Sequence, residues 1–136
     1  MEYRFFCFGK NASNLELSLE NKVIGAASTS FVNQIADGDC LFMYVNSQIH
    51  ALVKVVGNSF QSSERVWPNK LYPFRLKIEV LEIFSPPLDF LSSPCRDDLY
   101  EEFGKGWGYQ FLYSPKPIPK KSVAKLLKTE FLETTI

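Results

Sequence analysis

Long hydrophobic runs are missing from this sequence. Its longest apolar stretches have the length of a single β-strand, which leaves no candidate for a transmembrane helix. The N-terminus lacks the layout of a signal peptide, because the acidic residue Glu2 follows the first residue directly. We therefore expect a cytoplasmic protein.

Cysteine is scarce as well. Cys7, Cys40 and Cys95 are odd in number and far apart, and their spacing fits neither a zinc site nor a disulfide framework. We expect reduced thiols that are buried as small hydrophobic side chains.

Signatures of catalysis are weak. The only histidine, His50, lies within a predicted strand, and no third member of a Ser/His or Cys/His arrangement is obvious. Gly104-x-Gly106-x-Gly108 does not join a strand to a helix as a phosphate-binding loop does. We expect no metal, no other cofactor and a function in binding rather than catalysis.

Net charge is zero, which argues mildly against indiscriminate binding of polyanions, but the charges are unevenly distributed. Acids dominate residues 79–103, whereas residues 105–129 contain lysines and no acid. Such a segment either contacts phosphates or forms the solvated face of a terminal helix. The lysines that we select as phosphate contacts are Lys116, Lys120 and Lys121.

The composition is typical of a globular protein, with 46% hydrophobic and 15% aromatic residues. The length of 136 residues fits one domain over residues 1–136. Two apolar runs at 39–45 and 49–56, joined by a polar connection, predict a central β-hairpin with a turn at Gly38 before it. Neither run alternates cleanly, so we expect both faces to be covered.

Other elements follow from periodicity and from cap and turn residues. Residues 57–65 are predicted to form a loop. Residues 22–29 are predicted to form a thin segment at Gly25, which either lets the backbone approach another group closely or packs as a loop. The predicted strands are 2–8, 74–84 and 109–113, and the predicted helices are 14–21, 31–36, one or two within 88–103, and 120–132, with Val123, Leu126, Leu127 and Phe131 facing inward.

Two tryptophans stand in loops rather than in regular elements. Trp67 precedes a proline, and Trp107 lies between glycines. Each is expected either to line a pocket that stacks a flat ligand or to plug an end of the barrel. A base stacked on an aromatic ring gains roughly 1–3 kcal/mol, so two such walls could hold a flipped base.

The order of these pieces resembles that of an EVE domain, one of the PUA-like domains related to YTH and ASCH domains. The resemblance spans roughly residues 3–128. It rests on the opening aromatic strand, Asn11-x-x-Asn14, the Gly25 segment, Gly38-Asp39 before the hairpin, Tyr72-Pro73-Phe74-Arg75 and Gly106-Trp107. It implies an α+β fold, a small PUA-like mixed β-barrel flanked by short helices.

EVE and YTH domains are known or thought to read modified bases in an aromatic cage. EVE-like modules also serve as N-terminal specificity domains of McrBC-type modification-dependent restriction enzymes. The resemblance thus implies a module that binds a modified or flipped base in DNA or RNA, with a fused or separate NTPase/nuclease subunit as partner. The implied ligand-binding residues are Asn11, Asn14, Ile24, Gly25, Ala26, Trp67 and Trp107.

The chain departs from the family pattern at one cage wall. Ile24 precedes Gly25 where the family usually has tryptophan, so this wall is aliphatic and loses ring stacking. Two alternatives therefore stay open. One is an ASCH-like enzyme that acts on RNA or a modified nucleoside with Lys54, His50 or the acidic cluster, and the other is a protein-interaction module with a decayed pocket.

Overall fold

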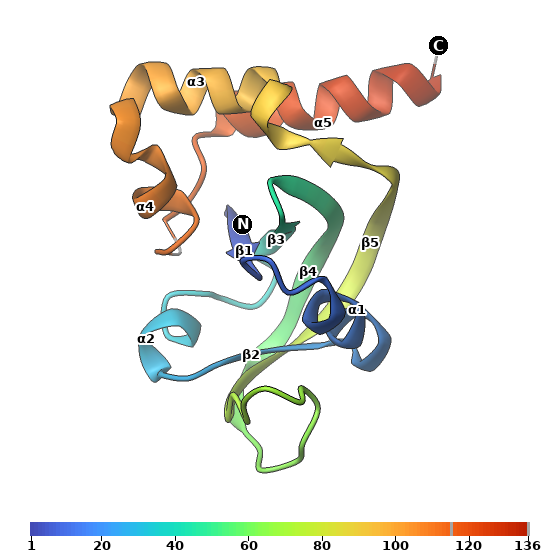
Figure 1. Cartoon of the computed structure of the whole chain (residues 1–136), viewed down its shortest axis with the longest axis vertical. Coiled ribbons are helices and arrows are strands. Elements are labelled where there is room, and N and C mark those ends of the chain that lie inside the picture. Colours follow the sequence, from blue (N-terminus) through green and yellow to red (C-terminus); the bar gives the residue numbers. More distant parts are fainter. Residues whose placement is uncertain (115, 136) are drawn as a thin grey trace.

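A single mixed sheet of five strands forms the centre of the protein in the computed structural model. The structure describes residues 1–114 and 116–135, with side chains for 1–114 and 116–127. The strand order is β1-β3-β4-β5-β2, with β1 and β3 parallel and the other pairs antiparallel. The strands are β1 (Tyr3–Cys7), β2 (Val23–Ala26), β3 (Cys40–Val45), β4 (Gln48–Gln61) and β5 (Phe74–Asp89). The sheet curls into a half-open barrel flanked by helices, which confirms the predicted α+β class (Figure 1).

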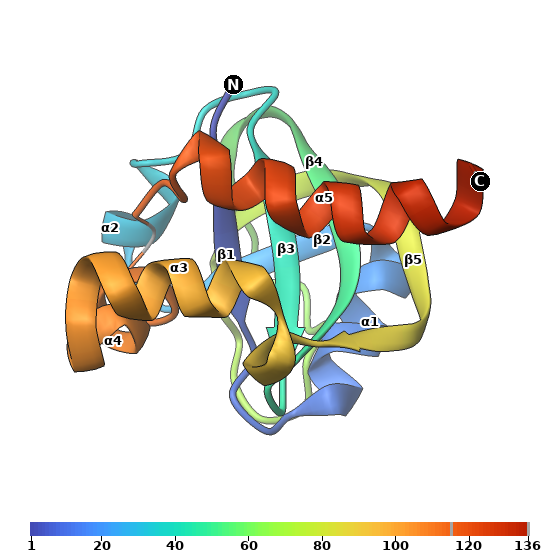
Figure 2. The same cartoon turned by 90° about the horizontal axis from the view of Figure 1, so that it is seen from above.

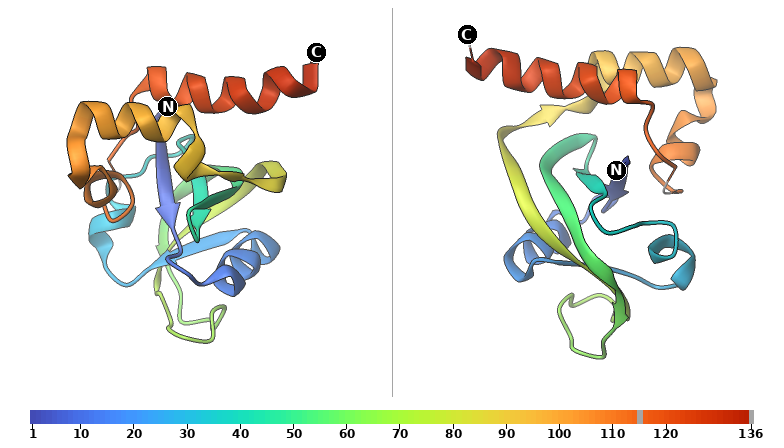
Figure 3. Two further views of the ribbon diagram at one scale, coloured as in Figure 1. Left: turned by 45° about the horizontal axis from the view of Figure 1, so that its top comes forward. Right: turned by 180° about the vertical axis from the view of Figure 1, so that it is seen from behind.

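Helices pack around the sheet (Figure 1). At one end α3 and α5 lie side by side, and the loop of residues 62–73 forms the opposite end (Figures 1 and 3). No helix in the described residues is long and apolar enough to cross a membrane. The helices are α1 (Ala12–Asn21), α2 (Thr29–Val32), α3 (Pro94–Phe103), α4 (Trp107–Phe111) and α5 (Lys120–Thr135), with 3-10 turns at Phe90–Ser92 and Gly104–Gly106.

The predicted hairpin is formed by β3 and β4. Its turn is the two-residue kind: Asn46 and Ser47 both have positive φ, at 51° and 62°, which matches the twist of the flanking strands. Gly38 has a φ of 91° in the turn before β3, as expected.

β3 separates two hydrophobic cores, which explains its unbroken apolar sequence. Cys40, Phe42 and Tyr44 belong to the core that α3, α4 and α5 cover, and the residues between them point into the core with α1 and α2. Figure 2 shows α5 crossing over β3 and β4 on the first side. The prediction that both faces of the hairpin are covered is therefore confirmed for β3.

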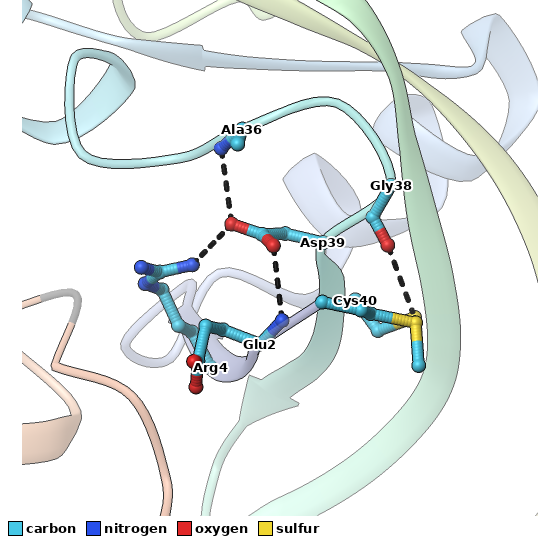
Figure 4. Close-up of polar contacts among 7 residues, drawn as sticks. Glu2, Arg4, Ala36, Gly38, Asp39 and Cys40 are labelled. Atoms are coloured by element: carbon cyan, nitrogen blue, oxygen red, sulfur yellow. Dashed lines mark hydrogen bonds and ion pairs between the residues drawn. The ribbon is translucent and has the colours of Figure 1, made fainter.

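A buried ion pair joins the starts of β1 and β3. Arg4 Nη1 lies 2.5 Å from Asp39 Oδ2, which also accepts a hydrogen bond from the Ala36 amide, while Asp39 Oδ1 accepts one from the Glu2 amide (Figure 4). Burial raises the pKa of Asp39, but these donors outweigh it and hold the pKa below its usual value.

Several predicted element boundaries are wrong. α1 begins at Ala12, two residues before the predicted start, and is capped by Asn11, whose Oδ1 accepts the Asn14 amide. The segment at Gly25 is a strand, β2, because it pairs with β5. β4 extends through the predicted loop to Gln61, and β5 continues through Pro86 and Pro87 to Asp89.

The region after β5 differs in another way. One α-helix, α3, forms within 88–103, and Pro94 occupies its first turn, a position where the missing N–H of proline is no loss. Residues 109–113, predicted as a strand, belong largely to α4. In α5, Val123 and Leu126 are buried and Leu127 is half-buried, while the side chain of Phe131 lies outside the described residues.

Candidate nucleobase-binding site

A cavity of about 220 Å³ opens where the end of β1, α1, β2 and the 62–73 loop meet. We call it the Trp67 cavity. It is lined by Phe6, Cys7, Phe8, Asn11, Asn14, Ser18, Gly25, Trp67, Asn69 and Tyr72. Of the seven predicted ligand-binding residues, the structure brings Asn11, Asn14, Gly25 and Trp67 together here.

Trp67 is a fixed wall of this cavity. Its indole Nε1–H donates to Ser18 Oγ at 3.0 Å, which ties the loop to α1. The Tyr72 ring meets it edge-on, with centroids 5.5 Å apart. The side chain is only 2% exposed, so packing fixes its position, and the small part of the ring that stays accessible lines the cavity.

Gly25 makes room for the indole. A Cβ at this position would lie 2.6 Å from Trp67 Cζ3 and 2.8 Å from Tyr72 Cβ, which is closer than side chains can approach. The glycine that was predicted to permit a close approach therefore does so, and the group that approaches is Trp67 itself.

Arg75 holds the 62–73 loop in place through hydrogen bonds. Its guanidinium donates to the carbonyl oxygens of Glu64, Leu71 and Tyr72, three points along the 62–73 loop. Its Cζ also lies 5.1 Å from the centre of the Trp67 ring. One side chain from β5 thus fixes both the path of the loop and the ring that the loop carries.

A chain of side-chain hydrogen bonds forms the polar side of the cavity. Asn14 Nδ2 donates to Asn69 Oδ1 at 2.9 Å, and Asn69 Nδ2 donates to the Tyr72 hydroxyl oxygen at 2.8 Å. Asn14 Oδ1 is buried, and among the described residues it has no hydrogen-bond partner. A buried acceptor without a donor costs free energy unless a ligand supplies one.

The remaining predicted residues lie elsewhere. Trp107 is buried in the core of α3, α4 and α5, with its ring 5.6 Å from that of Phe90, so the two tryptophans do not face each other. Ile24 points into the other core and is 1% exposed, and Ala26 packs against the same core. Because β2 alternates, Gly25 faces the cavity while Ile24 faces inward.

Lys120 and Lys121 begin α5, at the end of the molecule opposite the 62–73 loop (Figure 1), and Lys116, the third predicted phosphate contact, lies in the segment before α5. Lys121 forms an ion pair with Glu102, and the Lys116 ammonium lies 4.5 Å from the centre of the Phe103 ring. By contrast, Lys10 and Lys70 are exposed and each adjoins a residue that lines the cavity.

Sequence reasoning missed Ser18, Asn69 and Tyr72. Tyr72 and Asn69 follow Trp67 within one loop, and this closeness in sequence was the available signal. Nothing in the sequence points to Ser18, because its role depends on how α1 packs against the loop.

The groups considered for catalysis do not line the cavity. No histidine, lysine or carboxylate is among the lining residues of the Trp67 cavity. His50 and Lys54 lie on β4, and Asp98 and Glu102 on α3 are paired with Lys125 and Lys121. Within the described residues no group of three histidine, cysteine or acidic side chains could hold a metal ion.

No protein-family model matches the sequence, and no curated protein is significantly similar to it. Solved structures, however, share its fold. The YTH domain of Mmi1 matches with a TM-score of 0.64 at 9% identity, over 99% of this chain and 92% of that one.

Two RNA complexes match in the same way. The YTH domain of Zygosaccharomyces rouxii MRB1 in complex with N6-methyladenosine RNA gives a TM-score of 0.59 at 12% identity, over 93% of this chain and 86% of that one. The YTH domain of Toxoplasma CPSF4, in complex with an m6A-modified 7-mer RNA, gives 0.55 at 17% identity, over 94% and 89%. At these identities the comparison concerns the fold: this chain has the fold of YTH domains.

Proposed function

We propose that the protein binds a single modified base of a nucleic-acid strand, preferably RNA, in the Trp67 cavity. The observation that carries this proposal is the fixed indole of Trp67 beside the unpaired, buried acceptor Asn14 Oδ1. The ring supplies a stacking surface, and the amide oxygen requires an N–H on the ligand edge.

The size of the cavity supports this ligand class. Cavities for drug-sized molecules usually span about 300–1,000 Å³, and the Trp67 cavity, at about 220 Å³, suits one base rather than a larger molecule. The absence of histidine, lysine and carboxylate side chains from its lining supports binding over proton-transfer chemistry.

The solved structures with this fold support RNA as the partner, since two of them are described as complexes with methylated RNA. Preference for modified DNA would instead fit the specificity domain of a restriction system. Matched DNA and RNA strands therefore belong in the same binding experiment.

Replacing Trp67 by alanine should weaken binding of the preferred modified strand by roughly 10–100-fold, because one stacked base is worth about 1–3 kcal/mol. Fluorescence anisotropy at low salt, with strands that carry N6-methyladenine, 5-methylcytosine or no modification, measures the change. Thermal unfolding of each variant shows whether it is folded.

Two further variants make the result specific. Asn14→Leu has similar volume and removes the unpaired acceptor, so it should also weaken binding. Trp107→Phe alters the other tryptophan, in the far core, and should leave the affinity within about twofold. Equal affinity for modified and unmodified strands, or full binding by folded Trp67→Ala and Asn14→Leu variants, would contradict the proposal.

A further inference from the structure

A second and larger cavity lies next to the first, on the side of Trp67 where Arg75 lies. Its volume is about 540 Å³, within the range of small-molecule sites. We call it the Lys77 cavity. It is lined by Asn21, Lys22, Val23, Val56, Phe60, Ser62, Glu64, Val66, Arg75, Lys77 and Ile78.

Positive charge dominates this cavity. Lys22, Lys77 and Arg75 contribute three cations, against the single acid Glu64. Arg75 is 2% exposed, and in the described part of the chain no ion pair joins it to a carboxylate. A buried guanidinium that is compensated only by carbonyl oxygens still favours a nearby anion.

The sheet register explains why these groups meet. Val23 and Val56 pair with Lys77 from its two neighbouring strands, and Lys77 follows Arg75 by two residues, so both cations point to the same face of β5. Lys22 comes directly before β2, where its carbonyl oxygen accepts the Ile78 amide at 3.0 Å.

The same cavity has an exposed apolar wall. Val56 and Phe60 on β4 are 42% and 36% exposed, although both are large hydrophobic side chains. Cations beside an exposed aromatic ring suit a ligand that combines an anionic group with a flat or apolar body.

We propose that the Lys77 cavity binds a phosphoryl group attached to a flat or apolar body. A nucleotide is a ligand of this kind. Lys22, Lys77 and Arg75 hold the phosphoryl oxygens, and Phe60 contacts the body. Arg75 links the two cavities, because it lines this one while its guanidinium lies 5.1 Å from the centre of the Trp67 ring, which lines the other.

The phosphoryl group has two sources: a free nucleotide, or the strand whose modified base occupies the Trp67 cavity. Only the second source rests on the proposed function. The test therefore begins without any oligonucleotide, with inorganic phosphate and adenosine monophosphate titrated into ¹⁵N-labelled protein.

We expect the backbone amide signals of Val56, Phe60 and Lys77 to shift on addition of either compound. The indole signal of Trp67 should shift as well, while that of Trp107, which lies in the far core, should not. The variant Lys22→Asn/Lys77→Gln should weaken both ligands at least tenfold, since the loss of one charge-assisted hydrogen bond, worth about 1.5–3 kcal/mol, already lowers the affinity by about that factor or more.

The control variant is Lys105→Gln, which removes an exposed lysine from the other end of the molecule. No shift in the wild-type protein, or equal affinity in the Lys22→Asn/Lys77→Gln variant, overturns the proposal. Equal weakening by Lys105→Gln also overturns it, because the effect would then be one of overall charge.

The second arm separates the two sources. A methylated nucleoside is compared with longer methylated strands. If the strand supplies the phosphate, the affinity of the longer strands falls in the Lys22→Asn/Lys77→Gln variant and that of the nucleoside does not. If a free nucleotide is the ligand, adenosine monophosphate binds in the presence of the strand. Absence of all oligonucleotide binding refutes the proposed function and leaves the phosphate titration to decide this site.

Discussion

At the scale of single residues, Asp39 shows how one side chain holds distant segments together. It accepts hydrogen bonds from Glu2, Arg4 and Ala36, which lie at the start of the chain, in β1 and before β3. Its carboxylate is almost fully buried, so each of these contacts acts in a medium that screens charge poorly.

Asp39→Asn should lower the free energy of unfolding by about 3 kcal/mol at neutral pH, because it removes the negative charge that faces the buried Arg4 guanidinium. The pKa of Asp39 is lowered in the folded state, so its contribution is present above about pH 4 and is lost as the pH falls through the folded value. Urea unfolding at pH 7 and pH 3 measures the difference, which should narrow at the lower pH. The exposed Asp97→Asn variant serves as control, and a constant difference across this range would contradict the expectation.

Single residues also mark where sequence reasoning ended. The resemblance supplied Asn11, Asn14 and Trp67, and the structure places all three around one cavity. It did not supply the division of roles, in which Asn11 caps α1 while Asn14 keeps an unpaired oxygen. That division depends on the orientation of α1 relative to the loop, which no local pattern encodes.

At the scale of elements, β2 is the strand that the sequence concealed. Val23-Ile24-Gly25-Ala26 contains a glycine and an alanine, which are poor strand formers, and it gains its conformation from pairing with β5. α4 presents the opposite case: Trp107 and Phe111, four residues apart, are both buried in one core, so tertiary packing favours a helix in a glycine-rich stretch. The β3–β4 hairpin, by contrast, could be predicted from its local sequence pattern without knowledge of tertiary contacts.

Gly25→Ala tests whether β2 and the 62–73 loop form one unit. The added methyl group cannot fit against Trp67 and Tyr72 without moving them, so we expect a loss of about 1–3 kcal/mol in the free energy of unfolding. Binding to the modified strand should weaken as well, because the indole is displaced. Denaturant unfolding and anisotropy measure the two effects.

Gly108→Ala provides a comparison, since a Cβ at Gly108 would meet no atom within 4 Å. It should leave binding unchanged. If Gly25→Ala were as stable and as tightly bound as Gly108→Ala, the close packing of Trp67 on β2 would be wrong.

At the scale of the whole molecule, only one of the two hydrophobic cores adjoins the candidate site. The core with α1 and α2 adjoins the Trp67 cavity, and the core with α3, α4 and α5 lies on the other face of β3. Charge follows the same division, because α5 with its lysines lies far from the 62–73 loop (Figures 1 and 3), whereas Lys70 belongs to that loop and Lys10 precedes Asn11, which lines the cavity.

This arrangement predicts which lysines affect strand binding. Lys10→Gln and Lys70→Gln should each weaken binding irrespective of sequence and reduce the salt slope by about one unit, the effect of one lost phosphate contact. The original prediction of phosphate contacts at Lys116, Lys120 and Lys121 is tested by Lys121→Gln in the same titration. A reduced slope in that variant alone would place the strand along α5 instead.

The three cysteines differ in their accessibility to a thiol reagent. Cys40 and Cys95 are sealed inside the core of α3, α4 and α5, and burial, followed by the nearby Asp98, raises the pKa of Cys95 to about 12. Cys7 is half-buried and lies in the wall of the Trp67 cavity. Burial raises its pKa too, although the Gly9 amide partly offsets this. A slow alkylating reagent would therefore label the unmodified protein at the cavity itself, so a reporter of occupancy could be attached there without changing any residue of the chain.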